Sequence, residues 1–273
     1  MENGKITKLK IPALSEFNFQ IKYTETNRNT HTYEIDLHKH DEFEIYVNVS
    51  GDVSFLVENN LYNLTRGDVI IAHPGEYHHC VYRSDATHKL FWILFDSQKN
   101  EHVLDFLKKD FSGNFISPRA DLREDLLDLC CEMHKGKLTD EEALYSFFRI
   151  LSILKTSRSN PDERSNLSTE LDEAIDYINA HLCEEITVAD ISKALFVSQK
   201  TLERKFKEIL DITPLEFIRR KKLLSAAEML QNGESVLSAG INVGYNDTSY
   251  FIELFKKYYG MTPYQYKKAH RKQ

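Results

Sequence analysis

Four side chains in the first third of the chain have the residue types and the spacing of a metal or polar-ligand site. The positions of His38, His40 and Glu44 differ by two and by four, so the three side chains are expected to share one face of a β-strand. His78 follows later in the chain. Three imidazoles with one carboxylate can complete the coordination of a transition metal, and the same groups hydrogen-bond polar small molecules.

Three interpretations of these four residues therefore remain open. They form a site for a divalent transition metal, or they line a metal-free pocket for a sugar or similar metabolite, or they are polar residues of a barrel that binds no ligand. Tyr46, Tyr77 and Trp92 could provide stacking faces for a sugar. His79 has the opposite strand parity to His78, so we expect it to face solvent.

The segments around these residues resemble the two sequence motifs of the cupin family. The first motif is carried by His38, His40, Glu44 and Gly51, and the second by residues 67–75 together with His78. Two positions depart from the pattern: Thr32 stands where a glycine is usual, and Tyr82 where an asparagine is usual. The resemblance implies a β-barrel over roughly residues 31–95.

The hydrophobic pattern of residues 31–95 independently predicts short strands that pair in a barrel or a sandwich. Apolar residues alternate with polar ones at Phe43, Ile45, Val47 and Val49, and again at Val53, Phe55 and Val57; residues 69–72 and 90–95 are continuous apolar runs. From about residue 100 the period becomes helical. Three helices are expected there, with apolar stripes at Val103, Phe106 and Leu107, at Leu122, Leu126, Leu127 and Cys130, and at Leu144, Phe147, Phe148, Leu151 and Leu154.

A polar segment over residues 156–167 contains a proline and lacks an apolar period, which predicts a linker. Charge also divides the chain. Residues 193–273 hold 15 basic and 8 acidic residues, a net of +7, whereas residues 1–192 hold 20 against 34, a net of −14. An acidic body with a basic end is typical of a sensor joined to a nucleic-acid reader.

The C-terminal region contains an internal repeat at an offset of 49 residues. Residues 206–217 and 255–266 share Phe-Lys, Thr-Pro and a final aromatic residue in register. Asp211 and Gly260 occupy the same slot just after a helix, where a left-handed backbone is common.

Each half of the repeat predicts a helix, a tight turn and a second helix. Residues 188–194 precede a turn, after which Ser198 caps residues 199–210; residues 236–243 precede a turn, after which Asp247 caps residues 248–259. This is the helix-turn-helix pattern, whose second helix enters the DNA major groove. The residues expected to contact DNA are Ser198, Gln199, Lys200, Glu203, Arg204 and Lys207 in the first unit, and Asp247, Thr248, Ser249 and Lys256 in the second.

Residues 215–230 are expected to form a rigid helix between the two units. Its basic run, residues 219–222, is expected to be a solvated face for at least half of its four side chains. Ser168 is a candidate N-cap for a preceding helix whose apolar stripe is Leu171, Ile175, Ile178 and Leu182.

These C-terminal residues resemble the AraC family of bacterial regulators. The matching stretches are Ile191 to Ala194, Ser198 to Lys207, Thr213-Pro214 with Phe217, Gly244-Tyr245, Ser249 to Phe251, Leu254 to Lys257 and Gly260 to Pro263. The resemblance implies a module of seven helices with two helix-turn-helix units on one face of DNA. It also implies dimerisation through at least one of the helices within residues 100–155. Three positions depart from the family pattern, namely Asp211, Ala239-Gly240 and Glu253, and the second of these predicts weaker packing.

Together these observations predict an α+β chain of two domains. Residues 1–155 form a cupin-like sensing and dimerisation domain, residues 156–167 a linker, and residues 168–273 an all-α DNA-binding domain. The expected function is a sequence-specific activator of transcription that responds to a small polar metabolite such as a sugar, with double-stranded DNA, RNA polymerase and a second copy as partners. The alternative is a cupin metal-binding protein or metalloenzyme with a helical appendage.

We expect no enzyme activity, because the sequence contains no nucleophile elbow, P-loop or dinucleotide fingerprint. Four cysteines without a CxxC pair and the absence of a long apolar run favour a cytoplasmic protein without disulfides or membrane segments.

Overall fold

The computed structural model describes residues 7–10, 18–27, 38–95, 113–157, 164–165 and 169–270. The chain divides into two compact units, residues 1–165 and 166–273. The expected helix at Val103, Phe106 and Leu107 lies outside the described residues, as do Ser168 and most of the expected linker.

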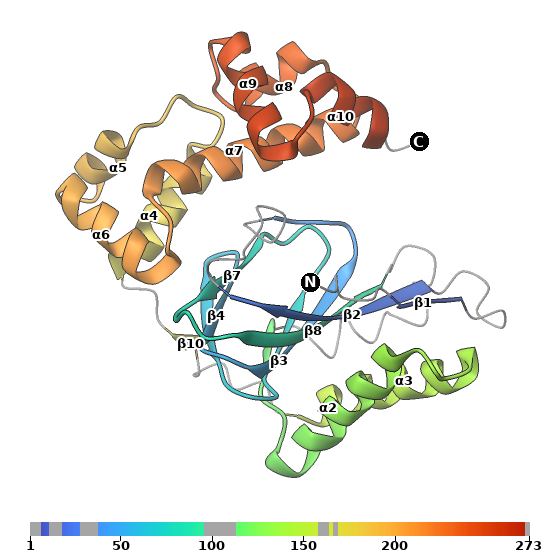
Figure 1. The fold of residues 1–273 in the computed structure, drawn as a ribbon. Coiled ribbons are helices and arrows are strands. Elements are labelled where there is room, and N and C mark those ends of the chain that lie inside the picture. Colours follow the sequence, from blue (N-terminus) through green and yellow to red (C-terminus); the bar gives the residue numbers. More distant parts are fainter. Residues whose placement is uncertain are drawn as a thin grey trace. The chain divides into compact units, whose positions relative to one another are not determined.

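The first unit is built from two antiparallel sheets (Figure 1). One has the strand order β1-β2-β8-β3-β6-β9 and the other β10-β5-β4-β7. The first sheet contains β1 (Thr7–Lys10), β2 (Asn18–Thr26), β8 (His88–Phe95), β3 (Phe43–Ser50), β6 (Val69–Ala72) and β9 (Phe115–Ile116). The second contains β10 (Arg164–Ser165), β5 (Asn60–Leu64), β4 (Val53–Val57) and β7 (His78–Tyr82). The expected α+β class is confirmed, although the sequence pattern did not predict β1 and β2.

Alternation along the strands assigns side chains to two different cores. Phe43, Ile45 and Val47 lie on the outer face of the first sheet and are buried against α2 (Ala120–Lys135) and α3 (Asp140–Thr156). Figure 1 shows these two helices covering one face of that sheet. Phe19 of β2 stacks on Phe147 of α3 with 4.8 Å between ring centroids. The apolar stripes of α2 and α3 therefore pack on the barrel.

The inner faces of the two sheets form the second core. Tyr46, Ile70 and Leu90 from the first sheet meet Phe55 and Cys80 from the second. Both faces of β4 and β7 are buried. His79 is consequently only 5% exposed, so the expectation that it faces solvent is wrong. The β10 pair, Arg164 and Ser165, lies within the stretch expected to be linker and instead pairs with Tyr62 and Leu61 of β5.

The second unit has seven helices within residues 169–270. They are α4 (Thr169–Ala180), α5 (Val188–Ala194), α6 (Gln199–Leu210), α7 (Pro214–Gln231), α8 (Val236–Asn242), α9 (Thr248–Tyr259) and α10 (Pro263–His270). Local caps set these bounds. Ser198, Thr213, Ser235 and Asp247 each accept a backbone N–H of the first turn that follows.

The α7 helix is the centre of this unit, and it corrects one expectation. Arg220, Lys221 and Lys222 are buried, at 8%, 1% and 4% exposure, so the solvated face predicted for the basic run is wrong. Their stems pack in the helical core. Arg220 and Lys222 donate hydrogen bonds to oxygen atoms, and Lys221 Nζ lies over the Phe217 ring, 6.0 Å from its centroid. Arg220 Nε, for example, donates to Glu216 Oε1 at 3.0 Å.

Packing around Gly240 is close rather than weak. A Cβ at Gly240 would lie 3.0 Å from a ring carbon of Phe251, so the missing methyl group gives space to that ring. Phe251 and Phe255 are fully buried in the cluster that joins α7, α8 and α9. The weaker packing predicted from this departure is therefore not found.

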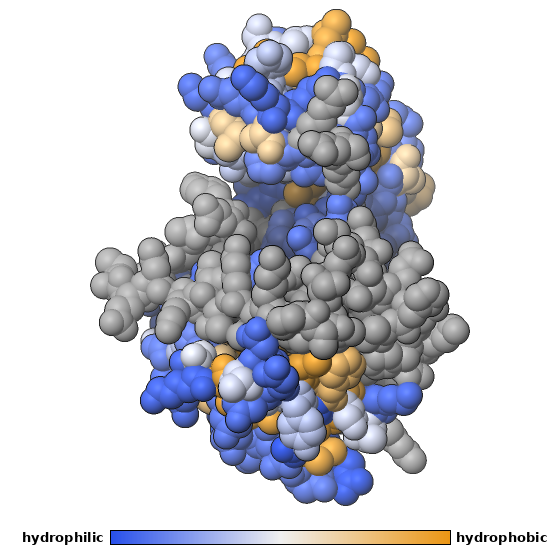
Figure 2. Space-filling view, turned by 90° about the vertical axis from the view of Figure 1, so that its right-hand side faces the viewer, coloured by the Kyte–Doolittle hydropathy of each residue, from blue (hydrophilic) through white to orange (hydrophobic). Residues whose placement is uncertain are grey.

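The face in Figure 2 shows apolar residues in separate small patches among hydrophilic ones. In the part of the chain that the structure describes, no helix is long and apolar enough to span a membrane. The described cysteines, Cys80, Cys130, Cys131 and Cys183, are all free thiols.

Candidate functional site

The first helix-turn-helix unit consists of α5, a turn and α6. Leu202, Phe206 and Leu210 of α6 are buried. The opposite side of α6 is open to solvent, and it carries Gln199, Lys200, Glu203, Arg204 and Lys207. Ser198 begins the helix, since its Oγ accepts from Thr201 N at 3.0 Å. Asp211 ends it with φ of 58°, which confirms the expected left-handed slot.

The second unit repeats this design with α8 and α9. Asp247 Oδ1 accepts from the N–H groups of Ser249 and Tyr250 at 2.8 and 3.1 Å. Phe251, Leu254 and Phe255 are buried, and Gly260 ends the helix with φ of 69°. The exposed side carries Ser249, Tyr250, Glu253 and Lys256, while Thr248 is half-buried.

Charge is distributed differently on the two exposed helix faces. Arg204 Nη1 donates to both carboxylate oxygens of Glu208, at 3.0 and 2.8 Å, and Lys207 Nζ lies 2.9 Å from Asp211 Oδ1. Exposed pairs of this kind contribute less than about 1 kcal/mol, so both cations can exchange these partners for phosphates or bases. Among the described residues, Glu253 of α9 has no ion-pair partner, and the pair with Lys257 that helical spacing would allow is not formed.

Tyr250 was not among the residues that the sequence led us to expect at the DNA. It is 41% exposed near the start of α9, and its hydroxyl accepts from Arg219 Nη2 of α7 at 3.0 Å. The sequence alone could have drawn attention to Tyr250, because it places an aromatic residue on the exposed side of the second helix of this helix-turn-helix unit. Large aromatic side chains are normally buried unless they have a partner.

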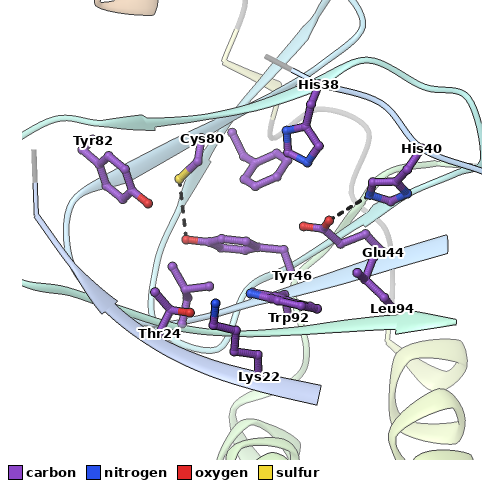
Figure 3. A pocket seen from close by; sticks show the side chains of 12 residues that line it. Lys22, Thr24, His38, His40, Glu44, Tyr46, Cys80, Tyr82, Trp92 and Leu94 are labelled. Carbon is purple, nitrogen blue, oxygen red and sulfur yellow. Dashed lines mark hydrogen bonds and ion pairs between the residues drawn. The ribbon is translucent and has the colours of Figure 1, made fainter. Parts of the chain in front are cut away.

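The first unit contains a cavity of about 240 Å³ between its two sheets (Figure 3). It is lined by His38, His40, Glu44, Tyr46 and Trp92, as predicted, and also by Lys22, Thr24, Phe55, Cys80, Tyr82, Leu90 and Leu94. His78, which was also expected to line the pocket, is not among these residues. Tyr77 does not line it, and its ring instead lies under Lys39 Nζ at 4.6 Å. Lys22 and Thr24 come from β2, which the sequence analysis did not predict.

The predicted His and Glu residues are brought together at one end of this cavity. His40 Nε2 lies 3.1 Å from Glu44 Oε2, and His78 Nε2 lies 3.5 Å from the same oxygen. Burial alone would raise the pKa of the Glu44 carboxyl, yet the imidazoles of His40 and His78 outweigh it and hold that pKa well below its usual value. Burial opposes the charged form of His40, but Glu44 raises the pKa of His40 overall.

Comparison with known proteins agrees with the geometry of both units. Residues 22–175 match the AraC-like ligand binding domain, and residues 191–269 match a helix-turn-helix domain. The chain belongs to the AraC family of transcriptional regulators. It is therefore a DNA-binding regulator of transcription and not an enzyme, and the metalloenzyme alternative is set aside.

Relatives of this AraC-family protein align over most of its length. It is 26% identical over 266 residues to the HTH-type transcriptional regulator YdeC of Bacillus subtilis, which covers 90% of each chain. It is 22% identical to the transcriptional activator RhaR of Mannheimia succiniciproducens, covering 85% of this chain and 86% of that one. Among solved structures, the C-terminal domain of AraT from Geobacillus stearothermophilus matches 40% of this chain and 92% of its own, with 29% identity and a TM-score of 0.39.

Proposed function

We propose that this AraC-family protein activates transcription when a small polar metabolite, such as a sugar, occupies the cavity of the first unit. The observation that carries the proposal is the cavity itself, in which the rings of Tyr46 and Trp92 lie beside polar atoms of Thr24, His38 and Glu44 (Figure 3). Sugars are bound by this combination of stacking faces and hydrogen-bonding groups.

Several finer points belong to the same proposal. The sensor occupies residues 1–155 together with β10, which pairs with β5, the DNA-binding domain occupies residues 168–273, and the rest of residues 156–167 links the two. We place the DNA contacts at Ser198, Gln199, Lys200, Glu203, Arg204, Lys207, Asp247, Thr248, Ser249 and Lys256, and add Tyr250. Activation is supported by relatives whose names describe them as the transcriptional activators RhaR and RhaS. A homodimer and contact with RNA polymerase complete the proposal.

The proposal is tested on the full-length protein in two steps. DNA selected in vitro for binding should be bound with an affinity that falls steeply as salt rises, because cationic side chains displace counterions from phosphates. Trp92 is the single tryptophan of the chain and lines the cavity, so its fluorescence reports occupancy directly. A panel of sugars and related polar metabolites that leaves both this fluorescence and DNA affinity unchanged would contradict the sensor role.

Thr24 lines the cavity at the end away from Glu44, and replacing it tests whether the ligand forms a hydrogen bond there. Its Oγ1 is buried and has no hydrogen-bond partner. We expect Thr24→Val to weaken metabolite binding by about 0.5–1.5 kcal/mol, because one hydrogen bond to the ligand is lost. The same change should leave the stability of the free protein equal or slightly higher. Thr24→Ser keeps the hydroxyl and is the matched control in a Trp92 fluorescence titration.

The two reading helices should contribute unequally to specificity. Arg204 can bond guanine through O6 and N7, whereas Glu253, at the corresponding position of α9, can only accept hydrogen bonds. We expect Arg204→Ala to lose about 1–3 kcal/mol of DNA affinity and to relax the preference at one base position. Glu253→Ala should keep the specificity and bind slightly more tightly, because repulsion from phosphate is removed.

Both variants are compared against a library of operator sequences at one salt concentration. The proposed asymmetry is refuted if Glu253→Ala broadens the base preference more than Arg204→Ala does. Glu208→Ala is the control for the ion pair, since it frees Arg204 without removing it and should leave the base preference unchanged.

A further inference from the structure

Lys22 and Thr24 of β2 both reach the cavity between the two sheets of the first unit. The register pairs Lys22 with Trp92 of β8, and Trp92 with Tyr46 of β3, so these three side chains form one row across neighbouring strands. Thr24 lies two positions further along β2 and therefore faces the same way. All four residues line the cavity, and Figure 3 shows Lys22 and Thr24 together on the side away from His40.

Neither polar group of β2 has a matching partner within the described residues. Lys22 Nζ lies over the Trp92 ring, 5.6 Å from the centroid, and forms no ion pair with a described carboxylate. An aromatic face attracts an ammonium group but accepts none of its three hydrogen bonds in the way an oxygen atom does. Thr24 Oγ1 is buried without a hydrogen-bond partner. A ligand oxygen that accepts from both groups would satisfy them together.

The two ends of the cavity differ in charge. Glu44 Oε2, at the other end, already has the imidazoles of His40 and His78 at 3.1 and 3.5 Å. An ammonium group only donates hydrogen bonds and a carboxylate only accepts them, so an acceptor on the ligand suits Lys22 while its hydroxyl groups suit Glu44. Of the described residues that line the cavity, Lys22 is the one lysine or arginine. One negative charge on the ligand therefore matches the cavity better than a phosphate, which carries nearly two.

We propose that the ligand of the sensor cavity carries a carboxylate, as a sugar acid does, and that this carboxylate accepts from Lys22 Nζ and Thr24 Oγ1. The inference rests on the proposed sensor function and adds the charge of the ligand to it. The cavity supplies the rings of Tyr46 and Trp92 as stacking faces for the body of such a molecule. Hydrogen bonds between charged groups are stronger than those between neutral ones, and more so inside a protein than in water. The carboxylate consequently separates the ligand from neutral sugars of the same size.

The test titrates the full-length protein with ligands that are alike in shape but differ in charge. The probes are D-glucuronate, D-galacturonate and D-gluconate, with the uncharged amides of the two uronates, the parent sugars and glucose 6-phosphate as comparisons. Trp92 fluorescence reports occupancy, and isothermal titration calorimetry measures Kd independently of the fluorophore. We expect at least one acid to bind about tenfold to a hundredfold more tightly than its neutral counterpart, because a hydrogen bond to a charged group is replaced by a weaker one.

Lys22→Met removes the charge and keeps the length of the side chain. It should bring the affinity for the acid down to that for the neutral counterpart and change the affinity for the latter by less than about twofold. Lys89→Met is the matched control, since Lys89 lies in the same sheet on β8 but pairs with Glu25 Oε1 at 3.3 Å and does not line the cavity. This variant should keep the preference for the acid. Circular dichroism verifies that each variant is folded.

Three results would overturn the carboxylate and leave the sensor function standing. They are a neutral sugar or amide that binds as tightly as the acid, a sugar phosphate that binds more tightly, and a Lys22→Met protein that keeps the preference of the wild type. If acids, neutral sugars and the phosphate all leave Trp92 fluorescence unchanged and give no heat of binding, both the carboxylate and the sensor function are overturned.

Discussion

Replacing Gly244 with alanine is expected to destabilise the C-terminal unit by about 3 kcal/mol or more, the range of severe single substitutions. Gly244 follows α8 with φ of 74°, a left-handed conformation that alanine adopts at a cost of about 1 kcal/mol. A Cβ there would also press on the backbone of Glu184, with the carbonyl carbon 2.6 Å away, and on Lys222 Nζ at 2.7 Å. Backbone atoms at such distances can relax only by moving the helices.

Gly260→Ala separates the two effects. Gly260 has nearly the same φ, 69°, but a Cβ there would meet nothing within 4 Å. It should therefore cost only the conformational term of about 1 kcal/mol. Urea unfolding followed by circular dichroism at 222 nm measures both variants, because Trp92 lies in the other unit and does not report on these helices. Equal losses in the two variants would show that the contact at Gly244 is unimportant.

Lys222→Met is expected to destabilise the C-terminal unit by about 2–4 kcal/mol. It is also expected to weaken DNA binding by both helix-turn-helix units. Lys222 Nζ donates to the carbonyl oxygen of Glu184, just before α5, and to that of Val243 at 2.8 Å, just after α8. Burial disfavours the charged form of Lys222 and lowers its pKa. The two hydrogen bonds to carbonyl oxygens offset part of this cost. Methionine would fill the space but leave both carbonyls unpaired, at about 1–3 kcal/mol each.

The loss of the lysine should also disturb the spacing of the two helix-turn-helix units, because Lys222 of α7 is hydrogen-bonded to both of them. DNA carrying both half-sites should therefore be bound more weakly, whereas DNA carrying one half-site should be affected less. Lys268→Met removes an exposed lysine of α10 and is the control, with an expected change in stability within about 0.5 kcal/mol. A Lys222→Met protein with the unfolding midpoint of the wild type would contradict the proposed tether.

The helices of the reader could be placed from the sequence because local chemistry determines their ends. The bounds of α5, α6 and α9 agree with those expected, since Ser198 and Asp247 cap their own first turns. The left-handed residues Asp211 and Gly260 end the helices for equally local reasons. Strand parity predicted that His38, His40 and Glu44 share one face of a strand, and this is wrong: only Glu44 lies in β3, whereas His38 forms an isolated bridge with His78 and His40 lies before the bend at residues 41–42.

The tertiary structure alone determined what lies opposite those residues. Thr24 and Lys22 reach the cavity only because β2 pairs with β8, placing Lys22 beside Trp92. No local signal specifies such a pairing across some 70 residues. Burial of Lys221, Lys222 and His79 was decided in the same way, because a charged or polar side chain can be buried wherever other elements bring oxygen atoms or cover both faces of a strand. The sequence by itself determined the helices of the C-terminal unit, their caps and the alternation along β3 and β4, whereas long-range packing determined the cavity wall and the burial of the lysine that contacts both helix-turn-helix units.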